Sequence, residues 1–337
     1  MKRSHRLEKL ARIYDDEILP IWAHRFGRMI LRGLDIPPKA MLLDVACGTG
    51  YPALEVLRKM DEQSRLIAID SSSAMLDVAR KKAGDAMGKR VFFRTESAFP
   101  KLPFASDVYD VVMCNLGLAE MSPEMGSPRT ALADFARVAK PGGRVVATLP
   151  LAGTWQEFFD IYREVLVKHD KTATLDRLDA HVATLPTLEV AEEWLVAAGL
   201  DKPRVEVEEF TLLFRSAREF FFAPVVEYGP LPRWKEIAGR GDEMQEVFWH
   251  IKNAIDAYFD GRAFHVTVKA GCLTGTRPER PPVEDDTTGK VERVALDSGD
   301  EALAIDSQDV EIVDRGDDPY EGPYEDDELD VLKDRDP

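Results

Sequence analysis

The stretch that decides the fold is Met41-Leu-Leu-Asp-Val-Ala-Cys-Gly-Thr-Gly-Tyr-Pro52, an apolar run followed by a glycine loop and a proline. The apolar run predicts a buried strand over 41–46, and Pro52 suits the first turn of a helix. Gly48 and Gly50 let the backbone turn tightly and approach a ligand, while the free N–H groups at the helix start point outward. The stretch therefore predicts a strand, a ligand-binding loop and a helix in succession.

The same alternation of apolar runs and helical patterns continues along the chain. Four further runs have the composition of buried strands, at 66–70, 91–94, 109–115 and 144–149. Strands this continuously apolar favour a parallel sheet that is buried on both faces. Repeated strand and helix units predict an α/β fold with a doubly wound sheet, to which alternating patterns at 204–214 and 264–273 add two strands.

Helical patterns flank this sheet on either side in the sequence. Residues 1–40 form a predicted N-terminal helical segment, interrupted at Pro20. The main domain is expected over 41–276, and within it residues 215–263 hold too many aromatic side chains for a surface connection. We therefore predict a helical cap insert over 215–263 that packs at the carboxyl edge of the sheet.

The charge of the chain is concentrated in its last part. Of 61 acidic and 44 basic residues, 22 acidic and 7 basic lie in 277–337, so the tail carries most of the net charge of −17. This composition predicts a disordered acidic tail, with a solubilising role or, as an alternative, a role in docking a basic protein partner. Since no basic stripe stands out, nucleic acid is not an expected partner.

The sequence also bears on location and on metal binding. No apolar run approaches the roughly 18 residues of a membrane span, and no signal peptide is evident, so we expect a cytoplasmic protein with no membrane span. Cys47, Cys114 and Cys272 are far apart and lack a second Cys or His at the spacing of metal ligands. They are interpreted as reduced core thiols, and no metal site is expected.

The residues around the glycine loop suggest what it binds. Asp70 follows Gly50 by twenty residues and closes the second predicted strand, where a carboxylate can accept both ribose hydroxyls of a nucleoside. The glycine pattern alone also fits an NAD-dependent oxidoreductase. Asp44 argues for another ligand, because a carboxylate there would repel a pyrophosphate and attract the ammonium and sulfonium groups of S-adenosylmethionine.

Four motifs in order resemble those of class I S-adenosylmethionine-dependent methyltransferases. They are LLDVACGTG at 42–50, LIAIDSSSAML at 66–76, LPFASDVYDVV at 102–112 and ARVAKPGGRVV at 136–146. The combination is most similar to the methyltransferase type 11 group, which includes ubiquinone and menaquinone biosynthesis methyltransferases, and the resemblance covers about 10–274. It implies a seven-stranded Rossmann-like sheet with an antiparallel last strand, and methyl transfer to O, N or C of a small organic acceptor.

The resemblance also implies a set of cofactor-binding residues. Asp44, Asp70 and Asn115 would contact the methionyl part, the ribose hydroxyls and the methyl-transfer face, in that order. The remaining members line the loop (Ala46, Cys47, Gly48, Gly50) and the adenine (Ser71, Met75, Glu96, Ser97). Ala46 stands where many relatives have glycine.

Catalytic residues stay unassigned at this level. Methyl transfer from an activated sulfonium depends on positioning, so a base is needed only if the acceptor must lose a proton. Glu120, His181 and His250 are candidate bases. Tyr14 and Trp22 could cover the cofactor as a lid or pack on the sheet. A non-catalytic S-adenosylmethionine-binding adaptor that acts through the acidic tail is a further alternative, and the oligomeric state is open.

Overall fold

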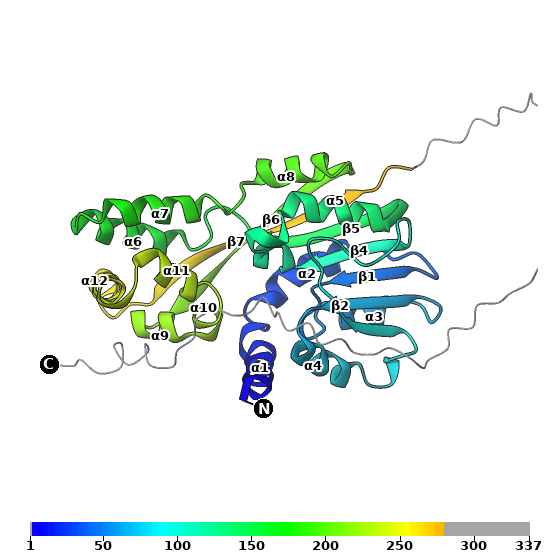
Figure 1. The fold of residues 1–337 in the computed structure, drawn as a ribbon, viewed down its shortest axis with the longest axis horizontal. Helices are drawn as coiled ribbons and strands as arrows, with labels where there is room; N and C mark the ends of the chain where they lie inside the picture. The colour runs from blue at the N-terminus through cyan, green and yellow to red at the C-terminus, as the bar shows by residue number, and fades with distance from the viewer. Residues whose placement is uncertain (1, 280–337) are drawn as a thin grey trace, which may run out of the picture. The chain divides into compact units, whose positions relative to one another are not determined.

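The computed structural model describes residues 2–279, which form a seven-stranded sheet with helices on both faces (Figure 1). The strand order is β3-β2-β1-β4-β5-β7-β6, and β7 is antiparallel to both of its neighbours. The strands are β1 (Met41–Val45), β2 (Arg65–Asp70), β3 (Val91–Thr95), β4 (Tyr109–Asn115), β5 (Ala139–Pro150), β6 (Asp201–Phe214) and β7 (Phe264–Thr276). The predicted fold class, with its antiparallel last strand, is confirmed.

Several helices begin after a serine whose side chain caps the first turn. Ser72 and Ser127 cap two of them, with side chains that accept hydrogen bonds from the backbone of the first turn. The α-helices are α1 (Lys2–Ile13), α2 (Ala23–Gly33), α3 (Ala53–Lys59), α4 (Ser73–Ala83), α5 (Pro128–Val138), α6 (Gln156–Lys168), α7 (Thr172–Val182), α8 (Leu188–Ala197), α9 (Ala217–Phe222), α10 (Pro224–Glu227), α11 (Leu231–Ala238) and α12 (Gly241–Phe259). Shorter turns are the π-helix η1 (Tyr14–Ile18) and the 3-10 helices η2 (Gly84–Ala86), η3 (Gly117–Glu120) and η4 (Pro123–Met125).

Neighbouring residues of β1 pack on opposite faces of the sheet. Leu42 lies in a buried cluster with Phe26 of α2 and Val56 of α3. Leu43 lies in another, with Phe135 of α5 and Leu195 of α8. Because successive side chains of a strand alternate between faces, an uninterrupted apolar run is buried on both sides.

Two hydrogen bonds fix the direction of α2 across the sheet. The carbonyl of Ala23 accepts from the side-chain amide of Asn115, at the carboxyl end of β4, at 3.3 Å. The carbonyl of Gly33 accepts from the guanidinium of Arg144 in β5 at 2.5 Å. Since Arg144 pairs with Val111, α2 runs from the carboxyl edge of the parallel strands toward their amino edge.

The cap is built on an extension of the last two strands. β7 pairs with β5 only from Ala270 to Thr276, whereas its pairing with β6 continues to Phe264. Helices α9 to α12 lie between these two strands in the sequence and, with α6 and α7, gather around the extension (Figure 1). Their shared core holds Trp155, Phe158, Phe159, Tyr162, Phe220, Phe221, Trp234 and Phe248. Most of the aromatic side chains therefore serve the core of the cap.

The start of β5 differs from the prediction. The sequence predicts a strand at 144–149, preceded by the helix-stop residues Pro141, Gly142 and Gly143, but α5 ends at Val138 and β5 already begins at Ala139. The register shifts between Tyr109 paired with Ala139 and Val111 paired with Arg144. The proline and glycines thus form an irregularity within the strand, where the missing N–H of proline is tolerated.

The N-terminal segment connects the sheet and the cap. It changes from α1 to a π-helix at Tyr14–Ile18, where the amide of Leu19 donates to the carbonyl of Tyr14 at 2.8 Å. Tyr14 and Trp22 each pack against both the sheet core and the cap core. The indole of Trp22 stacks on that of Trp155, with ring centroids 5.4 Å apart.

Two further findings concern only the described part of the chain. Within it, no helix is both long and apolar enough to cross a membrane. Within residues 2–279 there is also no group of three or more His, Cys, Asp or Glu side chains that could hold a metal ion. The predicted acidic tail lies outside the described residues, except for Arg277, Pro278 and Glu279.

Candidate functional site

The loop after β1 has three residues with left-handed backbone. Ala46, Gly48 and Gly50 have φ of 57°, 52° and 95°. The loop is anchored by hydrogen bonds of 2.9 Å from the amide of Cys47 to Ile69 and from the amide of Gly50 to Cys47. Glycine adopts this backbone freely, whereas alanine at position 46 costs about 1–2 kcal/mol. The loop at the end of β1 is therefore tightly specified.

Asp44 is a buried carboxylate with no hydrogen-bond partner among the residues that the structure describes. Its side chain has no exposed surface, and neither of its oxygens accepts a hydrogen bond from any residue in 2–279. Burial raises the pKa of Asp44 well above its usual value, and the nearby charge of Asp70 raises it further. A buried carboxylate of this kind favours a cationic ligand, which would supply the missing partner.

Asp70 closes β2 and is held against the glycine loop. One carboxylate oxygen accepts from the amide of Gly48 at 2.8 Å, and the other accepts from the amide of Ser72 at 2.9 Å. Burial raises the pKa of Asp70, and the two hydrogen bonds oppose that change. Each oxygen keeps a further acceptor position, so the carboxylate is oriented and can still receive hydroxyl groups.

Tyr14 reaches the loop from the π-helix. A Cβ placed on Gly48 would lie 3.7 Å from the ring carbon Cε1 of Tyr14. Burial raises the pKa of Tyr14, and the charges of Glu120, Asp70, Asp15 and Asp44 add to the effect. The phenol therefore stays protonated and can donate a hydrogen bond, within a site whose charged groups are carboxylates. These groups suit a cationic cofactor.

The residues predicted beside the adenine occupy the edge next to Asp70. Ser71 is exposed, and Met75 is half-buried in the first turn of α4. Glu96 donates its backbone amide to the carbonyl of Asp70 at 3.1 Å, and its carboxylate accepts from Arg94 at 2.8 Å.

Ser97, next to Glu96, is exposed, and its hydroxyl donates to the carbonyl of Phe99 at 2.7 Å. The predicted side chains thus follow the end of β3, next to β2. Their roles stay predictions.

Asn115 is buried at the end of β4 and already holds two partners. Its amide nitrogen donates to Ala23, and its oxygen accepts from the hydroxyl of Thr148 at 2.8 Å. The arrangement ties the carboxyl ends of β4 and β5 to the start of α2. A role for Asn115 at the methyl-transfer face stays a prediction, and its visible role is to fix that edge.

Burial makes the two thiols near the loop, Cys47 and Cys114, unreactive. Burial, with the charge of Asp44 next, raises the pKa of Cys47 and of Cys114. Cys47 lies with its sulfur 3.9 Å from the carbonyl oxygen of Gly48. Protonated thiols of this kind are poor nucleophiles, so Cys47 contributes to the shape of the loop.

The three candidate bases are separated by the fold. Glu120 ends η3, which follows β4, and its charge acts on Tyr14. His181 lies on α7, where its ring meets the edge of Phe159, and His250 lies on α12, where it stacks on His169 at 3.8 Å. Of the three, Glu120 is the one whose charge raises the pKa of Tyr14, the residue that reaches the loop.

The structure also shows a contact that the sequence analysis did not identify. A Cβ placed on Gly117 would lie 2.6 Å from the Cβ of Ala46 and 2.8 Å from the sulfur of Cys114. Leu116, before it, has a left-handed φ of 70°. The glycine after Asn-Leu is the only signal of this close approach in the sequence, and glycines in loops have many uses.

Comparison with known proteins agrees with this geometry. Residues 42–143 match the methyltransferase domain family. A demethylmenaquinone methyltransferase of Bacillus cereus is 26% identical over 216 residues, which are 60% of this chain and 88% of that protein. One from Halalkalibacterium halodurans is 29% identical over 175 residues, which are 49% and 69% of the two chains.

A solved structure has the same fold. It is a protein of Bacillus halodurans assigned to the methyltransferases, with a TM-score of 0.50, 16% identity, and coverage of 75% of this chain and 98% of that one. The family match over residues 42–143, the strand order and the succession of motifs therefore all agree with a class I S-adenosylmethionine-dependent methyltransferase.

Proposed function

We propose that the protein transfers a methyl group from S-adenosylmethionine to a small, flat and mainly apolar acceptor, at an O, N or C atom. The observation that carries the cofactor part is Asp44, a fully buried carboxylate with no partner among residues 2–279, beside the left-handed glycine loop. A pyrophosphate would add negative charge next to Asp44 and Asp70. A sulfonium and an ammonium group would neutralise it.

The residues around the glycine loop each have a role in this proposal. Asp44 would face the cationic methionyl part, and Asp70 would accept the ribose hydroxyls while Gly48 and Ser72 hold it in place. Tyr14 would cover the loop and exclude water. The bound cofactor would supply a methyl group already activated by the positive sulfur, so the residues mainly position the acceptor in line with it.

The acceptor class rests on two lines of support. The curated relatives above are named demethylmenaquinone methyltransferases. In this chain, the partly exposed rings of Trp22 and Phe210 meet at the junction of the N-terminal segment and β6, with centroids 6.3 Å apart. Aromatic surfaces of this kind suit a planar acceptor.

Glu120 is the proposed base for an acceptor that must lose a proton. It follows the carboxyl end of β4, and its charge is felt by Tyr14 at the cofactor loop. The side chain of Glu120 is exposed, and a positioned carboxylate can take up the proton that a phenolic acceptor loses. Glu120→Gln should therefore lower kcat for a phenolic acceptor and leave cofactor affinity within about twofold.

The experiment is a turnover assay with S-adenosylmethionine that carries an isotopic methyl label. Reduced naphthoquinones and simple phenols form one group of candidate acceptors, and alkylamines form the other. We expect label to enter the first group and S-adenosylhomocysteine to accumulate in equal amount, with both lost in Asp70→Asn. Transfer only to the amines would contradict the acceptor class. No transfer despite cofactor binding would favour the non-catalytic adaptor.

A further inference from the structure

Three arginines on the exposed face of α2 form a short basic strip. From Ile18 to Leu34 the chain has no Asp or Glu, although it holds 61 of them in total. Arg25, Arg28 and Arg32 follow one another at spacings of three and four residues, and all three are exposed. This spacing places them along one side of the helix.

Part of this strip forms a hollow with Lys59 at the end of α3. The basic hollow has a volume of about 450 Å³ and is lined by Arg28, Leu31, Arg32 and Lys59. The ammonium group of Lys59 donates to the carbonyl of Leu31 at 2.7 Å, which holds α3 against α2. Three cations thus surround one space, and the residues that line it include no carboxylate.

The cations of the basic hollow are not all neutralised within the described chain. The guanidinium of Arg32 pairs with Glu208 of β6, at the edge of the sheet. Arg28 has neither a hydrogen bond nor an ion pair with any residue in 2–279, and its side chain is exposed. A positive charge is therefore left to attract a ligand.

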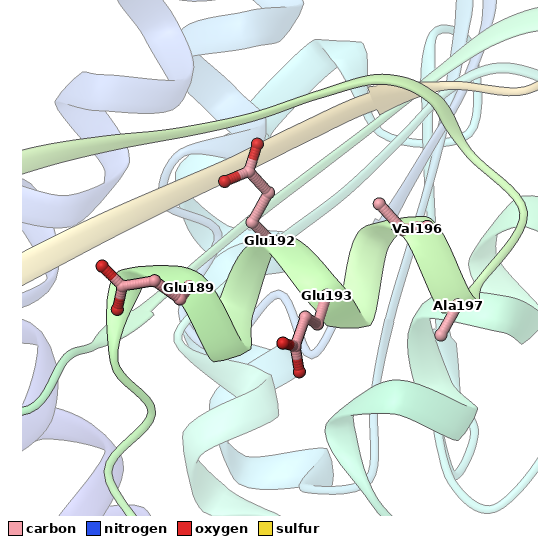
Figure 2. Close-up of a pocket in the computed structure, with 5 residues that line it drawn as sticks. All are labelled: Glu189, Glu192, Glu193, Val196 and Ala197. Carbon is pink, nitrogen blue, oxygen red and sulfur yellow. The ribbon is translucent and has the colours of Figure 1, made fainter.

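A second shallow hollow provides a comparison. It lies on α8, has a volume of about 420 Å³, and is lined by Glu189, Glu192, Glu193, Val196 and Ala197 (Figure 2). Figure 2 shows its three carboxylates spread along one helix and pointing outward. The two hollows thus carry opposite charges, so the basic one is not a general feature of the surface.

The basic hollow is separate from the methyl-transfer site. The start of α2, at Ala23, is bonded to Asn115 at the carboxyl edge, and its end, at Gly33, is bonded to Arg144. Leu31 is eight residues beyond Ala23, which is about 12 Å along a helix axis. A ligand in the hollow would therefore bind on another side of the domain from Asp44.

We propose that the basic hollow binds a phosphate group, carried either by a soluble molecule or by a lipid headgroup. Arginine forks match the oxygens of phosphate in pairs, and lysine adds a compact charge. Because Arg32 is paired with Glu208, the three cations leave about two net positive charges, which balance the near-double charge of a phosphate monoester better than the single charge of a carboxylate. This proposal does not depend on the cofactor or on the acceptor.

The test measures binding of two probes to the full chain. Inorganic pyrophosphate is titrated by calorimetry, and vesicles with phosphatidic acid, whose headgroup is a phosphate monoester, are compared with neutral phosphatidylcholine vesicles in a sedimentation assay. Arg28→Ala removes the cation of the hollow that has no partner among residues 2–279, and Arg25→Ala is the matched control, since it removes an exposed cation of the same helix outside the hollow. Thermal unfolding checks that both variants fold.

We expect Arg28→Ala to weaken binding about five- to tenfold and Arg25→Ala to change it less than about twofold. Binding of pyrophosphate alone identifies a soluble phosphate ligand, and binding of the anionic vesicles alone identifies a headgroup. The proposal is overturned if the wild type binds neither probe, if Arg28→Ala binds as the wild type does, or if both variants lose binding equally.

Discussion

Replacing Gly117 by alanine should lower the free energy of unfolding by about 1–3 kcal/mol, the usual cost of an atom that does not fit. The added Cβ would lie 2.6 Å from the Cβ of Ala46 and 2.8 Å from the sulfur of Cys114. Carbon atoms in contact normally stay about 3.5–4.0 Å apart, so at least one neighbour must move. Ala46 is fixed by its left-handed φ of 57°, so the strain would fall on the cofactor loop.

A second substitution isolates the contact. Ala46→Gly removes one of the two close atoms and the left-handed cost of about 1–2 kcal/mol. Glycine also gives the unfolded chain more conformational freedom, which lowers the free energy of unfolding by about 0.5–1 kcal/mol. The single variant should therefore range from neutral to about 1.5 kcal/mol more stable than the wild type. In the double variant, Gly117→Ala should cost about 1 kcal/mol less than it does alone.

Urea unfolding of the four proteins measures these differences. The midpoint should shift while the slope with urea stays constant, which identifies a change in stability. The remaining contact with Cys114 keeps the rescue partial. The reasoning would be refuted if Gly117→Ala unfolded at the wild-type urea concentration, or if the two substitutions were strictly additive.

Two further predictions concern the site and the junction of the cores. Asp44→Asn should stabilise the cofactor-free protein more at pH 8 than at pH 5. Burial raises the pKa of Asp44 in the folded state above its value in the unfolded chain. The stability that Asp44 contributes is therefore fully present below the unfolded pKa and is lost as the pH rises toward the folded pKa. Thermal unfolding at both pH values measures this gain, and an equal or smaller gain at pH 8 would contradict it. Trp22→Ala should cost about 3 kcal/mol in urea unfolding, because its indole stacks on Trp155 and joins both cores. The matched control is Trp249→Ala, whose side chain is 50% exposed and should cost under about 1 kcal/mol; equal losses would show that Trp22 is no more than a surface residue.

The sheet could be predicted because each strand carries its own signal. Met41–Val45 and Tyr109–Asn115 are apolar runs buried on both faces, and their observed bounds lie within one residue of the predicted ones. The start of β5 could not be predicted in the same way. Pro141 and the glycines after it are helix-stop signals locally, but pairing with β4 places them inside a strand. Tertiary pairing overrode the local preference.

Only part of the candidate site could be predicted from the sequence. Asp44 and Asp70 close two predicted strands, and the carboxyl ends of parallel strands meet at one edge, so their proximity followed from topology. The π-helix at Tyr14–Ile18 has no comparable signal, because it differs from an α-helix only in hydrogen bonds that span five residues in place of four. The contact of Gly117 with Ala46 depends on two loops that are distant in the sequence.

Calorimetric titration with S-adenosylmethionine, using NAD as a comparison ligand, tests the central claim most directly. The wild type is compared with Asp70→Asn and with Asp77→Asn, a control on α4 whose carboxylate is 62% exposed and pairs with Arg80. We predict micromolar binding of S-adenosylmethionine and none of NAD, with affinity reduced at least about tenfold in Asp70→Asn and unchanged in Asp77→Asn. Binding of NAD, or binding of S-adenosylmethionine that survives Asp70→Asn unchanged, would contradict the account.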